Sequence, residues 1–372
     1  MKYSIAVLPG DGVGPEVIAE GTKVLDAIGK LYGHEFHYRT GLVGGAAIDK
    51  VGVALPDDVV PLCRSCHAIL FGAVGGPKWD NPESNIRPEQ AILGLRKALN
   101  LFANLRPVQV FPMLANASPL KLEVVKDVDM VIIRELTGGL YFGRPQRRWV
   151  SARGRQAVDT LRYSEKEIER VLRTAFELAR TRRKKVTSVD KANVLESSRL
   201  WRQVAEEVAV EYSGVKLEHI LVDTAAMRLV RDPASFDVMV TENMFGDILT
   251  DEASVVGGSM GMMASASLSG ASTALGGRRR VMRLGLYEPI HGTAPDIAGK
   301  NIANPIAMIR SVSLMLRYSL SLIKEADTIE KAVYDILATG YRTADIGSKG
   351  DPIIGTREMG DKIAQAVAQT KV

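Results

Sequence analysis

Short apolar runs alternate along this chain with longer stretches in which apolar residues recur at helical spacing. The runs are Ile5–Leu8, Ala68–Phe71, Met130–Arg134, Val186–Val189 and Val238–Thr241. Helical patterns separate many of them, which favours a largely parallel sheet covered by helices on its faces. The pattern therefore predicts an α/β fold, with functional residues gathered at the carboxyl ends of strands.

A glycine-rich turn, Gly10–Pro15, follows the first run and opens a helix at Pro15, where the missing N–H is harmless. A dinucleotide fingerprint would lie here, but Pro15 fills its third glycine position. No acidic residue ends a second strand at the usual distance either. This turn is therefore at most a neighbour of a cofactor.

A second loop, His291–Pro305, is rich in small residues and is the better cofactor candidate. Asp296 in this loop can accept hydrogen bonds from both ribose hydroxyls, whereas the 2′-phosphate of NADP would meet a like charge. The loop therefore predicts NAD as the cofactor. A glycine-rich surface loop with a structural Asp is the alternative.

Two carboxylates, Asp247 and Asp251, stand four residues apart and share one face of a predicted helix. Mg²⁺ commonly takes one or two carboxylates plus waters and substrate oxygens, so the pair is a candidate metal site. Solvated surface acids are the alternative. A metal-dependent phosphoryl-transfer enzyme would also suit such a pair, although the chain lacks a Walker A sequence.

Three arginines, Arg96, Arg106 and Arg134, are predicted near the ends of elements. Their planar guanidinium groups suit carboxylates, although each alone is more often a surface salt bridge. The net charge of +5 comes from dispersed basic residues without interleaved aromatics. An anionic small-molecule substrate explains this charge, and we expect no nucleic-acid partner.

Three further polar residues are candidates for proton transfer or metal binding. Tyr141 lies on a flexible turn after Arg134, and Lys191 follows a predicted strand. Asp223 follows apolar residues, where it is either a metal ligand or a helix N-cap. Core or rim packing for Tyr141 and a salt bridge for Lys191 are the alternatives.

Size and hydropathy restrict the class of protein. At 372 residues, the chain is expected to form two lobes of one unit, with crossovers between the lobes at Gly257–Gly258 and around Leu101 to Pro107. No apolar run approaches the ~18 residues of a membrane span, and the first residues do not read as a signal peptide. We expect a cytoplasmic protein without a membrane partner.

Five motifs, taken together and in order, resemble the isocitrate/isopropylmalate β-decarboxylating dehydrogenase family. They are Gly10–Glu16, Gly75–Asp80, Arg134–Gly139, Ser188–Val194 and Asn243–Asp251. The likeness runs nearly end to end. It implies a two-domain, non-Rossmann α/β fold with a large mixed sheet and flanking helices. The implied cofactor-binding domain is 1–101 plus 258–372, interrupted by a dimerisation and metal/substrate domain, 102–257.

The resemblance also implies roles for the candidate residues. Arg96, Arg106 and Arg134 would hold the malate carboxylates, and Tyr141 and Lys191 would carry protons. Asp223, Asp247 and Asp251 would bind Mg²⁺ or Mn²⁺, with Asp223 also beside the substrate. In the family, Lys191 and Asp223 reach into the neighbouring subunit's site, so a homodimer is expected. The implied NAD contacts are Gly75, Gly76, Glu89, His291, Gly292, Ala294, Asp296 and Asn304.

Substrate choice depends on a helical segment in which Glu89, Ile92 or Leu93, and Arg96 share a face. Apolar groups there fit an isopropyl substituent, whereas isocitrate relatives place small polar residues to meet a third carboxylate. The resemblance thus implies NAD-dependent oxidation and decarboxylation of 3-isopropylmalate to 4-methyl-2-oxopentanoate, a step of leucine biosynthesis.

Three segments depart from the family pattern. Ala264 stands where relatives usually carry Pro, and 270–284 looks like an insertion with a hairpin tip at Gly276–Gly277. The arm Gly143–Asp159 is long and basic, and is expected to clasp a second subunit.

Overall fold

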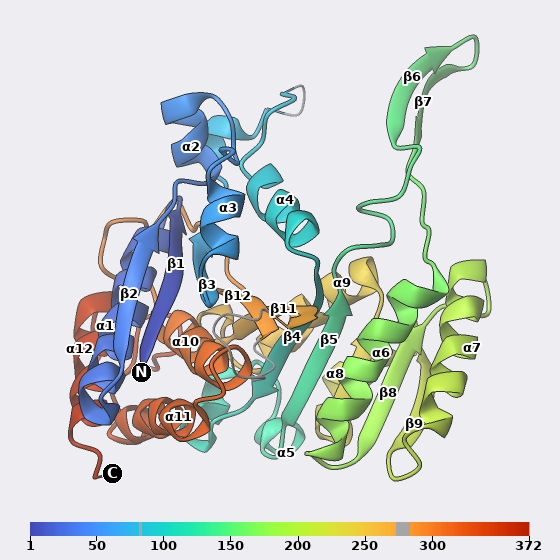
Figure 1. Ribbon diagram of the computed structural model, residues 1–372. Coiled ribbons are helices and arrows are strands. Elements are labelled where there is room, and N and C mark those ends of the chain that lie inside the picture. Colours follow the sequence, from blue (N-terminus) through green and yellow to red (C-terminus); the bar gives the residue numbers. More distant parts are fainter. Residues whose placement is uncertain (82–83, 273–282, 372) are drawn as a thin grey trace.

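The computed structural model describes residues 1–81, 84–272 and 283–371, in which ten strands form one sheet and two more form a separate hairpin (Figure 1). The order across the sheet is β2-β1-β3-β12-β11-β4-β5-β10-β8-β9. The strands are β1 (Lys2–Gly10), β2 (Glu35–Thr40), β3 (Ala68–Ala73), β4 (Leu101–Gln109), β5 (Asp129–Glu135), β6 (Arg147–Ser151), β7 (Gly154–Val158), β8 (Lys185–Asp190), β9 (Lys216–Leu221), β10 (Val238–Thr241), β11 (Ala264–Ser272) and β12 (Arg283–Pro289).

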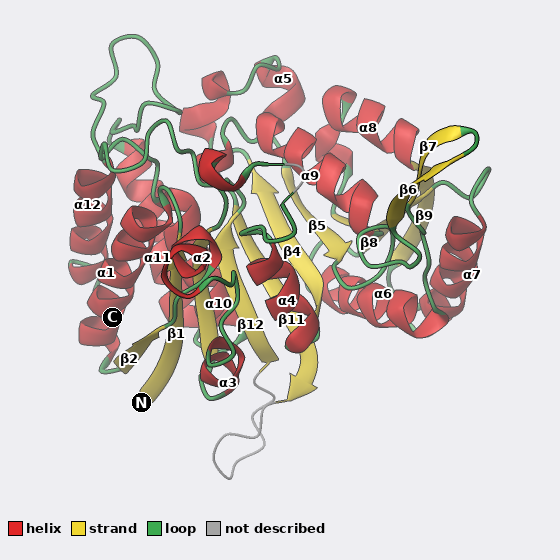
Figure 2. Cartoon of the chain, turned by 90° about the horizontal axis from the view of Figure 1, so that it is seen from above, coloured by secondary structure: helices red, strands yellow, loops and turns green. Residues whose placement is uncertain are grey.

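Helices flank this sheet on both faces (Figure 2). They are α1 (Gly14–Tyr32), α2 (Gly44–Val51), α3 (Val59–Arg64), α4 (Gln90–Ala98), α5 (Leu122–Val125), α6 (Glu165–Arg180), α7 (Glu196–Val210), α8 (Val222–Arg231), α9 (Asn243–Val256), α10 (Ile306–Tyr318), α11 (Ile323–Ala338) and α12 (Thr356–Ala368). Short 3₁₀ helices lie at Pro77–Trp79, Pro112–Ala117, Pro233–Ser235 and Met260–Met262.

The predicted apolar runs all lie within strands of the sheet, and the expected mixed sheet is confirmed. The expectation of a largely parallel sheet holds only for its two flanks. The pairs β12/β11, β11/β4 and β4/β5 at the centre are antiparallel. The strands on either side of this centre run parallel to their neighbours.

Helix α6 illustrates how local sequence sets an element. Ser164 and Glu167 form a capping box that satisfies backbone N–H groups at its start, an interaction that typically stabilises a helix by ~1 kcal/mol. Its buried residues include Ile168, Val171 and Leu172, which recur at helical spacing and pack against the sheet.

The two faces of the sheet differ in their packing. On one face, α1, α6, α7, α10, α11 and α12 contribute to a single continuous hydrophobic cluster. On the other face there are two separate clusters, one with α2, α3 and α4 and one with α5, α8 and α9. The surface between those two clusters is where the polar residues described below are placed.

The stretch around Leu101 to Pro107 was expected to lie at a crossover between lobes. It forms β4, a central strand, so the chain passes between the two halves of the sheet along a hydrogen-bonded strand. On the return path, α9 ends at Val256 and the chain continues through Gly257 and Gly258 toward β11.

The basic arm contains the β6–β7 hairpin, which projects away from the sheet (Figure 1). Trp149 and Val150 are exposed on it, Val150 to 79%. A lone two-stranded hairpin is marginally stable in water, so this arm is suited to pack against a partner.

The segment proposed as an insertion lies between β11 and β12, which pair antiparallel. Its expected tip at Gly276–Gly277 and the arginines Arg278–Arg280 lie outside the described residues. Ala264 is the buried first residue of β11.

Candidate active site

A band of polar side chains crosses the centre of the sheet on the face that carries two hydrophobic clusters. Asn104 and Arg106 alternate along β4 with the apolar Ala103 and Leu105, which enter the cluster on the opposite face. Asn104 pairs with Arg134 of β5, and residues directly opposite each other share a face. Asn104 also donates to Ser265 Oγ at 2.6 Å and Ser267 Oγ at 3.1 Å. The band therefore forms the floor of a polar cleft.

Arg106 is held in this band from two sides. Its Nε donates to Asn104 Oδ1 at 2.7 Å, and its Nη1 donates to Thr250 Oγ1 of α9 at 2.6 Å. Burial, and then the like charges of Arg134 and Arg96, lower the pKa of Arg106 to about 10. The three predicted arginines therefore create a positive field at one place, which favours an anionic ligand.

Arg134 links the end of β5 to α9. Its Nε donates to Asn243 Oδ1 at 3.0 Å, and its Nη1 pairs with the Asp247 carboxylate. Tyr141 donates to the other Asp247 oxygen at 2.9 Å. Burial, and then the hydrogen bond to Asp247, raise the pKa of Tyr141 to about 12, so its phenol is protonated near neutrality.

Asp247 and Asp251 lie one turn apart on α9, as the spacing predicted. Asp251 Oδ1 is 3.7 Å from Arg106 Nη1, and its side chain is 61% exposed. Burial of part of the carboxyl, and then the repulsion of Asp247, raise the pKa of Asp251 in spite of the attraction of Arg106, which lowers it. Two such carboxylates fit a hard cation whose remaining ligands are waters, substrate oxygens or another chain.

Asp223 and Lys191 pair with each other. Lys191 follows the last residue of β8, and its Nζ bonds the Asp223 carboxylate in the first turn of α8. The N-cap of α8 is Leu221, so Asp223 is not the cap that the alternative interpretation required. Across residues 1–81, 84–272 and 283–371, no three His, Cys, Asp or Glu side chains are grouped to hold a metal ion. Within one chain, Asp223 therefore does not join Asp247 and Asp251.

A cavity of about 160 Å³ opens between α4 and the polar band. The predicted residues that line it are Glu89, Ile92, Arg96, Arg106, His291 and Gly292. Glu89, Ile92 and Arg96 lie on one face of α4 and its N-cap, so Ile92 rather than Leu93 supplies the apolar wall. Arg96 Nη2 donates to Glu288 Oε1 at 3.1 Å, which orients the guanidinium at the cavity wall.

A second cavity of about 140 Å³ lies beneath the small-residue loop. Its lining includes the predicted His291, Ala294 and Asn304, together with Val13 of the glycine turn. A Cβ on Gly261 would stand 2.7 Å from Asp345 and 2.8 Å from Asn304, so glycine keeps this wall open. The small, mostly apolar lining fits an adenosine.

The remaining predicted cofactor residues lie at the edges of these cavities. Asp296 is exposed in a turn after Ala294 and does not line either cavity. Gly75 and Gly76 have φ values of 131° and 144°, and a Cβ on Gly75 would stand 3.2 Å from Glu89 Oε1. Gly75 N–H donates to Asp11 Oδ2 at 3.0 Å, so the glycine turn after β1 holds this segment in place.

Comparison with known proteins decides the family. The sequence model described as isocitrate/isopropylmalate dehydrogenase matches residues 4–363. This chain belongs to that family. It is 55% identical over 368 residues to a 3-isopropylmalate dehydrogenase of Dehalococcoides mccartyi, covering 99% of this chain and 100% of the relative. A 3-isopropylmalate dehydrogenase of Geobacillus kaustophilus is 56% identical over 366 residues, with 98% and 96% covered.

A solved member of the family has the same architecture. The crystal structure of isocitrate dehydrogenase from Methylococcus capsulatus superposes with a TM-score of 0.84 at 34% identity, covering 99% of this chain and all of that one. The resemblance stated from the motifs is confirmed by these matches. Among the residues that the structure describes, every helix is too short or too polar to cross a lipid bilayer.

The structure adds polar residues that the sequence motifs did not single out for roles. Asn104, Thr250 and Glu288 hold the arginines, and Asp345 accepts hydrogen bonds from Asn304 at 3.0 Å and Ser259 at 2.5 Å beside the second cavity. The alternation of polar and apolar residues in β4 was the one local signal for this set.

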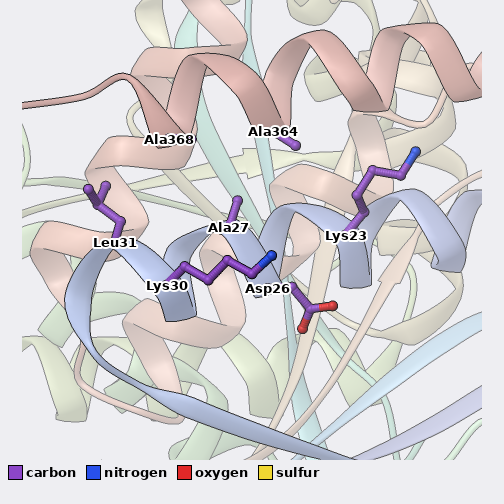
Figure 3. A pocket seen from close by; sticks show the side chains of 7 residues that line it. All are labelled: Lys23, Asp26, Ala27, Lys30, Leu31, Ala364 and Ala368. Atoms are coloured by element: carbon purple, nitrogen blue, oxygen red, sulfur yellow. The ribbon is translucent and has the colours of Figure 1, made fainter.

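A further hollow lies between α1 and α12. Figure 3 shows its lining, which α1 and α12 supply together. The lining residues are Lys23, Asp26, Ala27, Lys30, Leu31, Ala364 and Ala368. None of the predicted site residues lines it.

Proposed function

We propose that this protein oxidises and decarboxylates 3-isopropylmalate to 4-methyl-2-oxopentanoate, with NAD as the oxidant and a divalent cation, in the leucine biosynthesis of the cytoplasm. The observation that carries the proposal is the cavity in which Arg96 and Arg106 stand beside the apolar Ile92. An anion with a branched apolar substituent matches such a wall. The names of the relatives support the same substrate.

Charge at the cavity argues against isocitrate as the preferred substrate. Glu89 lines the same wall as Ile92, whereas Glu288 is already paired with Arg96. A third substrate carboxylate directed at this wall would meet like charge and an apolar surface, which costs free energy in both cases.

Arg96, Arg106 and Arg134 are proposed to hold the two carboxylates of malate. Arg134 and Arg106 are buried, and each is fixed by two polar partners. Substrate binding therefore costs little side-chain conformational entropy at these two residues. The substrate C2 is thereby fixed relative to the proton-transfer groups.

Asp247 and Asp251, with Asp223 of a second chain, are proposed to hold Mg²⁺ or Mn²⁺. The cation would supply Lewis-acid chemistry at the C2 hydroxyl and its neighbouring oxygens, and NAD would supply the acceptor for the hydride of C2. Lys191 takes the hydroxyl proton. After CO₂ leaves, Tyr141 donates a proton to C3, a role that suits a phenol still protonated at neutral pH.

A homodimer with shared sites is part of the proposal. Asp223, Met227 and Val230 recur at helical spacing on α8, and Met227 and Val230 are exposed. Ile248 and Val255 form a similar exposed stripe on the adjacent α9. A second copy of this chain would cover both stripes and bring its own Lys191–Asp223 pair to the cleft.

NAD is proposed to bind across 1–101 plus 258–372, and the dimerisation and metal/substrate domain is proposed to be 102–257. The adenosine would lie in the cavity lined by Ala294 and Asn304, with Asp296 at its ribose. Gly75, Gly76, Glu89, His291 and Gly292 would border the nicotinamide. The glycine residues leave room for close approach of the cofactor.

The decisive assay follows absorbance at the NADH band with purified protein, NAD and Mg²⁺. We expect turnover with 3-isopropylmalate, no turnover after chelation of divalent cations, and recovery when Mg²⁺ or Mn²⁺ is returned. Activity with isocitrate or tartrate in place of 3-isopropylmalate would overturn the substrate assignment. Asp247→Asn is expected to remain inactive at any cation concentration that restores the wild type.

A further inference from the structure

Asn243, the first residue of α9, makes three hydrogen bonds to three different parts of the chain. Its Oδ1 accepts from Arg134 Nε at 3.0 Å, and its Nδ2 donates to the Gly138 carbonyl at 3.0 Å. Its backbone N–H donates to Tyr163 Oη at 2.9 Å. The residue is 1% exposed, so each of these groups would be costly to leave unpaired.

The Gly138 carbonyl belongs to the turn that carries Tyr141. Glu135, at the end of β5, fixes the other side of this turn by accepting the Gly138 N–H at 2.7 Å. Gly143 N–H donates to the Gly139 carbonyl at 2.9 Å, which closes the turn around Tyr141. The height of the Tyr141 phenol above α9 therefore depends on where Gly138 is held.

The same amide also determines the direction of Arg134. The aliphatic stem of Arg134 lies in a notch on α9, because a Cβ on Gly246 would stand 2.7 Å from Arg134 Cγ. Because its stem lies in this notch and its Nε donates to Asn243, the guanidinium group of Arg134 is held in a single orientation. Arg134 also stacks over the Tyr141 ring, with 5.7 Å between its Cζ and the ring centroid.

We infer that Asn243 is a positioning residue that holds the substrate-binding Arg134 and the proton donor Tyr141 in one common frame. The inference rests on the proposed function for the roles of Arg134 and Tyr141. Only a planar amide offers one acceptor and one donor at this spacing. Aspartate keeps the acceptor for Arg134 but turns an oxygen toward the Gly138 carbonyl, and alanine offers neither.

The two substitutions therefore separate the two functions. We expect Asn243→Ala to raise KM for 3-isopropylmalate about tenfold and to lower kcat about 10²-fold, the scale of a misplacement near 1 Å. Asn243→Asp is expected to keep KM within about threefold of the wild type while kcat falls as far as in the alanine variant. Equal KM values in the two variants, or a wild-type kcat in either, would overturn the inference.

A double-mutant cycle adds a test that loss of stability does not mimic. If Asn243 acts through Tyr141, Asn243→Ala should slow a Tyr141→Phe enzyme by less than about threefold, whereas independent effects would multiply. Ser188→Ala is the matched control, because it removes a buried hydrogen bond from Trp201 Nε1 in the same half of the sheet. It should lower the Tm without changing either kinetic constant.

A crystal structure of Asn243→Ala tests the inference whatever the substrate is. Displacement of the Gly138 carbonyl and of the Arg134 guanidinium relative to the wild type is the expected result, and unchanged positions for both would overturn it. A wild-type enzyme that does not turn over 3-isopropylmalate would instead refute the proposed function.

Discussion

Lys191 Nζ and the Asp223 carboxylate form an ion pair at the end of β8 and the start of α8, away from the Asp247 carboxylate that Tyr141 contacts. Within one chain, the two candidate proton carriers therefore bond different carboxylates. In a symmetric dimer with shared sites, each cleft would combine Tyr141 of one chain with Lys191 of the other.

This arrangement predicts complementation between inactive variants. Lys191→Ala and Tyr141→Ala are each expected to be inactive, and an equimolar mixture should recover about a quarter of wild-type activity, since half the dimers are hybrids with one intact site. The measurement is NADH formation after subunit exchange is verified by mass spectrometry of the dimers. Exchange without recovered activity would contradict a shared site.

Asp296 is predicted to select NAD. Asp296→Lys should raise the kcat/KM ratio of NADP to NAD by about tenfold or more, a change of ~1.4 kcal/mol, because it replaces a repelling charge with an attracting one. Steady-state kinetics with both cofactors measures the ratio. Glu358→Lys, an exposed charge reversal on α12, is the control, and an unchanged ratio in Asp296→Lys would remove the proposed role.

Arg106 is predicted to serve binding at the expense of stability. Because burial and like charges lower its pKa, its charged form favours the unfolded chain. Arg106→Met should raise KM for 3-isopropylmalate by roughly 10²-fold while leaving the Tm equal or higher. A large drop in Tm would show that the residue is mainly structural.

Arg182 is the matched control for this experiment. Burial opposes its charge, but pairing with Asp129 and Asp237 outweighs that effect and raises the pKa of Arg182. Arg182→Met should therefore lower the Tm, and it should leave KM unchanged.

Glu218 on β9 is predicted to make the stability of the folded chain fall at low pH. Partial burial opposes its ionisation, yet hydrogen bonds from Lys185 and Arg228 lower the pKa of Glu218 to about 2. Its stabilising effect is thus full above the unfolded pKa of about 4.3 and is lost as the pH falls through about 2.

We expect Glu218→Gln to have a lower Tm than the wild type near neutral pH, with a difference that shrinks steadily below about pH 4.3. Calorimetry across this range measures the difference. The exposed Asp57→Asn serves as the control, and a difference for Glu218→Gln that does not vary with pH would contradict the ion-pair explanation.

Local patterns in the sequence were sufficient for strands β1, β3, β5, β8 and β10 and for the helix that carries Asp247 and Asp251. Each apolar run indicates a strand without reference to the rest of the chain, and two residues four positions apart on a helix share one face. The polar band is different, because Asn104 and Arg106 become neighbours of Arg134 and Ser265 only through strand pairing. That pairing joins segments far apart in the chain, and no local window contains it.

The antiparallel centre of the sheet is also invisible to a local window of sequence. The run at Leu101 contains Asn104, Arg106 and Pro107, which obscure a strand signal. Asp345 is likewise not marked by any motif in the sequence around it. Its importance is visible only from the hydrogen bonds that Asn304 and Ser259 donate to it.

The notch at Gly246 restricts how this enzyme can be re-engineered. Any side chain there would collide with the stem of Arg134, so α9 cannot be changed at this position while Arg134 keeps its place. The opposite wall is formed by the side chain of Ile92, which can be exchanged without moving backbone. Directed evolution toward malates with other C3 substituents should therefore collect its useful changes on α4 and leave α9 untouched.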